Sequence, residues 1–123
     1  MIVTTTRDAF VDAATRYDVV PVVAEVLADR ETPVTVYEKL VGGADGFLLE
    51  SVEGGEQWAR WSFIGWDPEF TLTARDGVTT ADGGSVAVPE GDPLTVLEAV
   101  LDQFSAAPLE GDAPPLHAGA VGY

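Results

Sequence analysis

Cysteine is absent from this 123-residue chain, and histidine and lysine occur once each. Without cysteine there is no disulfide, no thiolate nucleophile and no cysteine-ligated metal. The single histidine, His117, argues against a zinc site, and no neighbouring residue would orient it as a catalytic base. We expect a structural or solvent-exposed role for it. The paired glycines match neither a phosphate-binding loop nor a dinucleotide fingerprint. The chain itself therefore offers no catalytic residue.

Basic residues and long apolar runs are also scarce. Lysine and arginine total 6 against 21 acidic residues, which gives a formal charge of -15. Such a charge repels nucleic-acid phosphates and anionic lipid, so we expect neither nucleic acid nor membrane as a partner. No apolar run approaches the roughly 20 residues of a membrane-spanning helix. The N-terminus lacks the basic and apolar regions of a signal peptide, so a cytoplasmic location is expected.

The turn and capping signals predict an α+β fold, mainly antiparallel sheet with about three helices. The segment 19–27 fits either a strand or a short helix. In the third helix, Leu94, Leu97, Leu101 and Phe104 recur at helical spacing. Helices are expected from Thr6 or Asp8 to about Tyr17, from Thr32-Pro33 to Gly42-Gly43, and after Asp92-Pro93. Strands are expected at 47–52, 58–66, 70–74, 78–80 and 86–88, and a buried strand is expected to start within 116–123.

The hairpin predicted in the middle of the chain holds the most informative residues. Alternation along its first strand places Leu49 and Ser51 on one face and Glu50 on the other. On its second strand, Arg60 and Trp61 lie on opposite faces. Arginine is costly to hold in apolar surroundings unless it is paired or faces a ligand. This hairpin is therefore where a small anionic or zwitterionic ligand would be bound.

An amino acid ligand needs three partners, and the hairpin can supply each of them. Glu50 or a backbone carbonyl would accept from the ammonium group. Arg60 and Ser51 would donate to the carboxylate. Leu49 and Trp61 would form an apolar slot for the ligand's side chain. An ordinary hairpin, with Arg60 paired to a nearby carboxylate and the tryptophans in the core, accounts for the same residues. Spacing alone leaves both interpretations open.

Two short segments of the hairpin resemble a known family. Leu-Leu-Glu-Ser at 48–51, followed by Arg-Trp-Ser-Phe-Ile-Gly at 60–65, resembles the N-terminal region of anthranilate synthase component I. The segment 20–34 is similar to the opening of that family, and Gly-Ala-Val-Gly-Tyr at 119–123 is similar to the start of one of its strands. The resemblance covers about Asp18 to Tyr123, with 76–91 less distinctive.

The resemblance implies a function for the parent protein. Members convert chorismate and ammonia, or glutamine, to anthranilate and pyruvate in tryptophan biosynthesis. They use Mg²⁺ and a glutamine amidotransferase subunit. Their chorismate and metal residues lie in a C-terminal half that is absent here, so this chain alone is expected to be an inactive part of a lyase. The N-terminal half carries part of the site for the feedback inhibitor L-tryptophan, which implies binding by Leu49, Glu50, Ser51, Arg60 and Trp61.

The apolar C-terminal segment favours a chain cut within a strand, because domain ends are usually polar. Residues 1–123 are therefore expected to be the N-terminal regulatory region of a longer protein. Two alternatives stay open. One is component I of aminodeoxychorismate synthase, which has the same fold, and the other is a stand-alone amino-acid-binding module.

Overall fold

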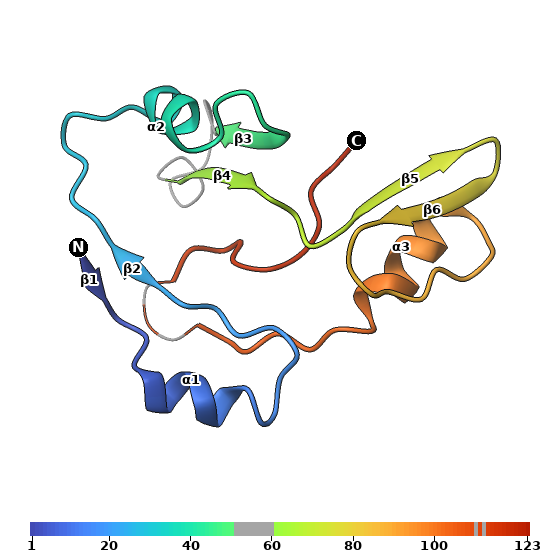
Figure 1. The fold of residues 1–123 in the computed structure, drawn as a ribbon, viewed down its shortest axis with the longest axis horizontal. Coiled ribbons are helices and arrows are strands. Elements are labelled where there is room, and N and C mark those ends of the chain that lie inside the picture. Colours follow the sequence, from blue (N-terminus) through green and yellow to red (C-terminus); the bar gives the residue numbers. More distant parts are fainter. Residues whose placement is uncertain (51–60, 110, 112) are drawn as a thin grey trace.

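The structure is a computed structural model that describes residues 1–50, 61–109, 111 and 113–123. Three helices and three two-stranded antiparallel sheets make up this described part (Figure 1). The predicted α+β class is confirmed. The sheets lie apart from one another along the chain and are joined by extended segments and helices (Figure 1). No helix among the described residues is long and apolar enough to cross a membrane.

The N-terminal part is a short ribbon with a helix in its connection. Strand β1 (Ile2–Val3) pairs with β2 (Ala24–Glu25), and α1 (Arg7–Ala13) lies between them in sequence. The hydroxyl of Thr6 caps α1 by accepting from the N–H of Ala9. The helix ends before the predicted Tyr17, and hydrogen-bonded turns continue to that residue. The ambiguous segment 19–27 contributes a strand rather than a helix.

The C-terminal part places a helix against a hairpin. Strands β5 (Thr71–Arg75) and β6 (Val78–Asp82) are joined by an Asp76-Gly77 turn in which both residues have positive φ. Asp-Gly favours this type of two-residue hairpin turn, so the sequence signal is confirmed. Helix α3 (Pro93–Leu101) begins after Asp92, whose carboxylate accepts from the N–H groups of residues 94 and 95. It packs near β6.

The most buried side chains of α3 are not among the residues whose spacing predicted this helix. Val96 and Val100 are the fully buried side chains, whereas Leu94 is 75% exposed. Leu101 is also exposed. Apolar residues occur on nearly every side of this helix, so periodicity alone did not select the packed face. Phe104 lies beyond the end of α3 rather than within it as predicted, and its ring stacks on Phe70 at 5.8 Å between centroids.

Two other predicted strands are not formed. Residues 86–88 are held instead by Gln103, whose side-chain amide donates to the carbonyl of Ala87 and accepts from its N–H. This side chain takes the place of a neighbouring strand. Residues 116–123 form no strand, and Val121 is 41% exposed. No described strand lies beside them in a sheet.

The first and last parts of the chain are tied together by one cluster of hydrogen bonds. The Asp18 carboxylate accepts from the N–H of Ser105 at 2.9 Å and from its hydroxyl at 2.7 Å. The N–H groups of Asp18 and Val19 donate to the Ser105 carbonyl, and Val19 and Ala106 form a parallel bridge. These bonds lower the pKa of Asp18, the hydroxyl bond most strongly.

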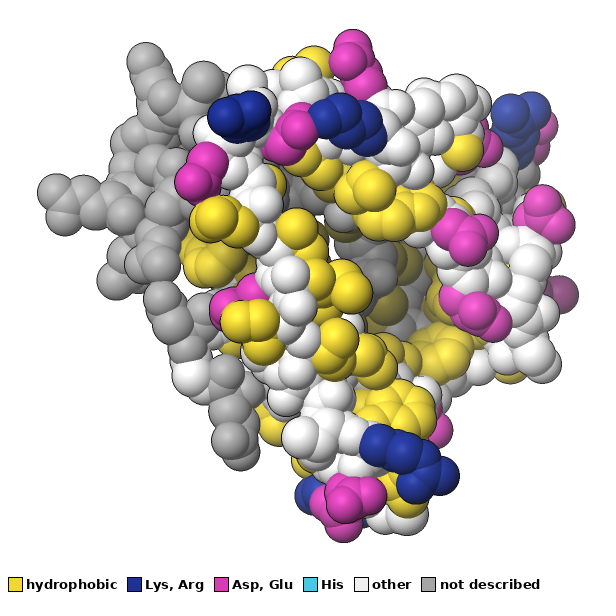
Figure 2. Space-filling view, turned by 60° about the vertical axis from the view of Figure 1, so that its left-hand side comes forward, with side chains coloured by type: hydrophobic (Ala, Val, Ile, Leu, Met, Phe, Trp, Pro, Cys, Tyr) yellow, Lys and Arg dark blue, Asp and Glu magenta, His cyan; other side chains and the backbone are white. Residues whose placement is uncertain are grey.

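Little of the described chain is buried. Among the described residues, the buried hydrophobic side chains are Val41, Val96, Val100 and Ala107. Hydrophobic side chains reach the surface around a hollow (Figure 2). The packed regions are therefore small and local, one beside each of α2 and α3.

Candidate functional site

The predicted central hairpin is present as an antiparallel strand pair. Strand β3 (Gly46–Glu50) pairs with β4 (Ser62–Trp66), with Glu50 opposite Ser62 and Leu49 opposite Phe63. The segment that connects them, 51–60, lies outside the described residues. Two predicted ligand residues, Ser51 and Arg60, fall within it. The strand pair therefore places the other three predicted residues, Leu49, Glu50 and Trp61.

Helix α2 (Pro33–Leu40) covers one face of this strand pair. A Cβ atom added at Gly46 would lie 2.6 Å from Cγ1 of Val41, which directly follows the helix. Gly46 therefore faces α2, and alternation turns Leu48 to the same side. Ile64 lies opposite Leu48 and shares that face. Val41 is 5% exposed, so this contact is well packed.

The opposite face carries Phe47, Leu49 and Phe63, and we call it the open face. Leu49 is 43% exposed, while both phenylalanines are half-buried. Phe47 lies opposite Gly65, and its ring occupies the space that a side chain at Gly65 would need. The open face is thus an apolar surface whose shape depends on a glycine.

Trp61 and Glu50 lie on different sides of the strand pair. Trp61 directly precedes β4, two residues before Phe63, and is half-buried. An extended chain places residues two apart on the same side, so Trp61 is expected beside the open face. Glu50 lies opposite Ser62 and is exposed, on the side that α2 covers. The structure therefore brings Leu49 toward the aromatic residues and turns the Glu50 side chain away.

Phe63 is the open-face residue that sequence reasoning did not select. It lies directly opposite Leu49 in the strand register. The signal was available, because alternation already placed Phe63 on the same face as Trp61. The register, which decides its partner on the other strand, was not fixed by the sequence alone.

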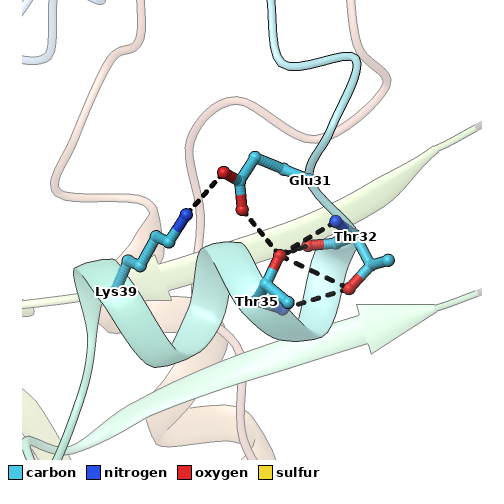
Figure 3. A network of polar contacts seen from close by, with 4 residues as sticks. All are labelled: Glu31, Thr32, Thr35 and Lys39. Atoms are coloured by element: carbon cyan, nitrogen blue, oxygen red, sulfur yellow. Dashed lines mark hydrogen bonds and ion pairs between the residues drawn. The ribbon is translucent and has the colours of Figure 1, made fainter.

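A network of polar contacts links Glu31, Thr32, Thr35 and Lys39 at the start of α2 and along it (Figure 3). The Thr32 hydroxyl accepts from the Thr35 N–H at 3.2 Å, and the Thr35 hydroxyl accepts from the Thr32 N–H at 2.9 Å. This is a reciprocal capping box, with threonine at the position that glutamate or glutamine usually takes. The predicted cap followed by Pro33 is confirmed. The helix that supports the site is thus fixed by its own sequence.

Glu31 extends this network to the far end of the helix. Its carboxylate accepts from the Thr35 hydroxyl at 2.7 Å and is paired with the Lys39 ammonium (Figure 3). The Lys39 contact is the main cause of the lowered pKa of Glu31, followed by the Thr35 hydrogen bond. The one lysine of the chain therefore has a structural role on α2.

The described residues contain no group of three or more histidine, cysteine, aspartate or glutamate side chains that would hold a metal ion. His117 is exposed. What the described part of the site offers is an apolar, partly aromatic surface on one side of a two-stranded sheet. This surface suits binding of an apolar or aromatic group.

Known proteins resemble this chain over nearly its whole length. No protein-family profile matches the sequence. A protein named anthranilate synthase component 1 from Mycolicibacterium smegmatis is 46% identical over 125 residues, which cover 98% of this chain and 23% of that relative. Over nearly its whole length, this chain is similar to part of anthranilate synthase component 1. The protein of that name from Mycobacterium tuberculosis H37Rv is 43% identical over 98% of this chain and 24% of its own length.

More distant members of the anthranilate synthase component 1 family match as well. The protein of that name from Acetivibrio thermocellus is 38% identical over 87% of this chain and 22% of its own length. The chain therefore spans less than a quarter of the curated relatives it matches. The resemblance found in the hairpin residues is confirmed at the level of the family.

Proposed function

We propose that this chain is the N-terminal regulatory region of an anthranilate synthase large component. The full-length protein would convert chorismate, with ammonia or glutamine as the nitrogen donor, to anthranilate and pyruvate. The observation that carries this proposal is 46% identity over 98% of the chain. A glutamine amidotransferase subunit would be its partner, and the location would be cytoplasmic.

We assign Mg²⁺ and the chemical step to the rest of that protein. The described residues include no cluster of carboxylates of the kind that holds this ion. The single histidine is exposed, and among the described residues no carboxylate is paired with it to make it a general base. The isolated 123-residue chain is therefore expected to form no anthranilate from chorismate.

We propose that the open face binds L-tryptophan, the feedback inhibitor. Leu49 and Phe63 lie opposite each other there, and Trp61 is expected beside them. An indole ring packs well on such a surface, because aromatic pairs gain about 0.5–1.5 kcal/mol beyond their area burial. Ser51 lies outside the described residues, and sequence alternation alone predicts it on the same side as Leu49.

The polar ends of tryptophan need partners that lie beyond the described strands. Arg60 and Ser51 would donate to the ligand carboxylate, which is a charge-assisted interaction in the case of Arg60. The register turns Glu50 toward α2, so a backbone carbonyl rather than the Glu50 side chain would accept from the ammonium group. Binding would inhibit the enzyme by favouring a state in which the chorismate site is less competent.

Serine-to-phenylalanine substitutions on the two faces of the strand pair test this assignment in the full-length enzyme. Ser51→Phe would fill the tryptophan site, so inhibition by L-tryptophan should be lost while the rate with chorismate is kept. Ser62→Phe is the matched control, because Ser62 is exposed and faces the α2 side. It should keep normal inhibition. Equal sensitivity of the two variants to tryptophan would refute the site.

Product analysis of the uninhibited full-length enzyme tests the activity separately. Anthranilate and pyruvate are the expected products. Aminodeoxychorismate would assign the chain to component I of that synthase instead, and salicylate would assign it to another chorismate-using enzyme. Tryptophan binding with no product at all would favour a stand-alone amino-acid-binding module.

A further inference from the structure

The β1–β2 ribbon exposes an unusual amount of apolar surface. Met1 is 88% exposed, Ile2 67%, Val26 64% and Leu27 86%. Together with Glu25, these residues line a depression on the surface. We call them the ribbon patch. Large apolar side chains gathered and exposed at one end of a strand pair mark a surface that another polypeptide covers.

The backbone of the ribbon is also incomplete as a sheet. Among the described strands, β1 and β2 pair only with each other. The Thr4 N–H donates to the Val23 carbonyl at 2.9 Å, so this pair is hydrogen-bonded. Hydrogen-bonded and non-hydrogen-bonded pairs alternate along an antiparallel ladder. The next pair, Val3 and Ala24, is therefore not hydrogen-bonded across the ribbon, and its N–H and C=O groups point outward to the two edges. Each edge is a template for a further strand.

The total surface area indicates how large the covering partner must be. The chain exposes 9759 Å². A compact monomer of 13.0 kDa is expected to expose about 6,300 Å². The excess is about 3,400 Å², whereas a standard interface covers about 800 Å² per partner. Even half of the excess is about twice what a symmetric dimer of ordinary size would cover.

Helix α3 supports the same conclusion independently of the ribbon. Val96 and Val100 are buried on one side, yet Leu94 and Leu101 are exposed on others. A helix that is apolar on most of its sides is normally covered by protein on more than one of them. Apolar surface therefore remains uncovered at two separate places in this chain.

We propose that the β1–β2 ribbon is an unfinished sheet, and that a strand from the rest of the parent protein completes it and covers the ribbon patch. This inference rests on the part of the proposed function that places the chain in a protein as long as its relatives. In those relatives about three quarters of the length lies outside the match, which is enough polypeptide to supply both the strand and the covering surface. A second copy of the chain is disfavoured by the size of the excess area.

Amide hydrogen exchange on the full-length protein, read at single amides, tests the proposal. The Val3 and Ala24 N–H groups point to the edges of the ribbon, so an added strand should protect at least one of them by about 100-fold or more. The amide of Val100, on the buried side of α3, serves as the protected reference. The exchange is measured at two protein concentrations that differ tenfold.

Three outcomes are possible, and each decides the question. Protection of Val3 or Ala24 that does not change with concentration supports the proposal. Exchange of both amides near the rate of an unfolded chain would overturn it. Protection that falls on dilution would also overturn it, because a second copy would then be the partner. Product and tryptophan assays do not enter this measurement, so an error in the assigned reaction would leave the result readable.

A pair of substitutions in the same protein gives a second measurement. Val26→Asp places a carboxylate in the ribbon patch and should lower the melting temperature by several degrees, because a buried unpaired charge is strongly unfavourable. Ala28→Asp is the matched control two residues away, where little apolar area is present to be covered. Equal and small effects of the two substitutions would argue against a covered patch.

Discussion

Gly46 is the position where the smallest change should disturb the support of the site most directly. In Gly46→Ala the new methyl group would lie 2.6 Å from Cγ1 of Val41 and 2.7 Å from the carbonyl oxygen of Gly65. Val41 is buried, and the oxygen belongs to the β4 backbone, so neither can move aside without shifting α2 or the strand pair. Overpacking of this kind costs about 1–3 kcal/mol. Alanine offsets about 0.4–1 kcal/mol of it by reducing the freedom of the unfolded chain.

The net expectation is a loss of about 1–2 kcal/mol in the stability of the unit that contains β3 and β4. Gly43→Ala is the matched control, since nothing lies within 4 Å of its added Cβ and its φ is not positive. Thermal unfolding of the full-length protein, followed by calorimetry, should show a lower midpoint for Gly46→Ala and an unchanged or higher one for Gly43→Ala. A shift of about 2–4 °C per kcal/mol applies to a cooperative unit of about 150–250 residues.

Adding Val41→Ala separates the two clashes. It removes Cγ1 but leaves the carbonyl oxygen of Gly65 in place, so the double variant should recover only part of the loss attributed to Gly46→Ala. A favourable coupling of about 0.5 kcal/mol or more is expected for residues in contact. Equal midpoints for Gly46→Ala and Gly43→Ala would refute the packing of α2 on this face.

Two further predictions concern the open face and the pH dependence of stability. Gly65→Ala displaces the Phe47 ring, which is the mobile end of a side chain. Stability should therefore fall less than in Gly46→Ala, while inhibition by L-tryptophan weakens more. Inhibitor titration checks this, and unchanged inhibition would contradict it. The hydrogen bonds of Asp18 and Glu31 lower the pKa of each carboxyl, so their contribution is present above about pH 4 and lost as the pH falls through the lower folded value. The difference in melting temperature between wild type and Asp18→Asn should therefore shrink below about pH 4, and a constant difference across that range would rule this out.

Local signals in the sequence predicted the elements that depend on local chemistry. Thr32-Pro33 and Asp92-Pro93 each supply a side-chain cap and a pre-set first helical residue, and both helices begin there. The Asp76-Gly77 turn fixed the β5–β6 pairing for the same reason. Such features need no partner from elsewhere in the chain, so a single sequence reveals them.

Features that depend on distant partners could not be predicted in the same way. Gln103 replaces a strand beside Ala87 from sixteen residues away, and nothing in residues 86–88 indicates this. Likewise, the register that pairs Leu49 with Phe63 depends on how two separate strands align, which neither strand's sequence shows by itself. The predicted ligand roles of Ser51 and Arg60 lie outside the described residues and stay predictions.

The bonds between Asp18 and Ser105 have a consequence for the order in which this chain folds. They join residues 87 positions apart, so closing that loop costs about 4 kcal/mol of chain entropy before any contact is made. The capped helices and the β5–β6 turn need only neighbouring residues and can form within microseconds. During synthesis Ser105 is also added after β1–β6 and α3 have been made. The joining of the two ends is therefore expected to be a late step, in which elements already formed are brought together.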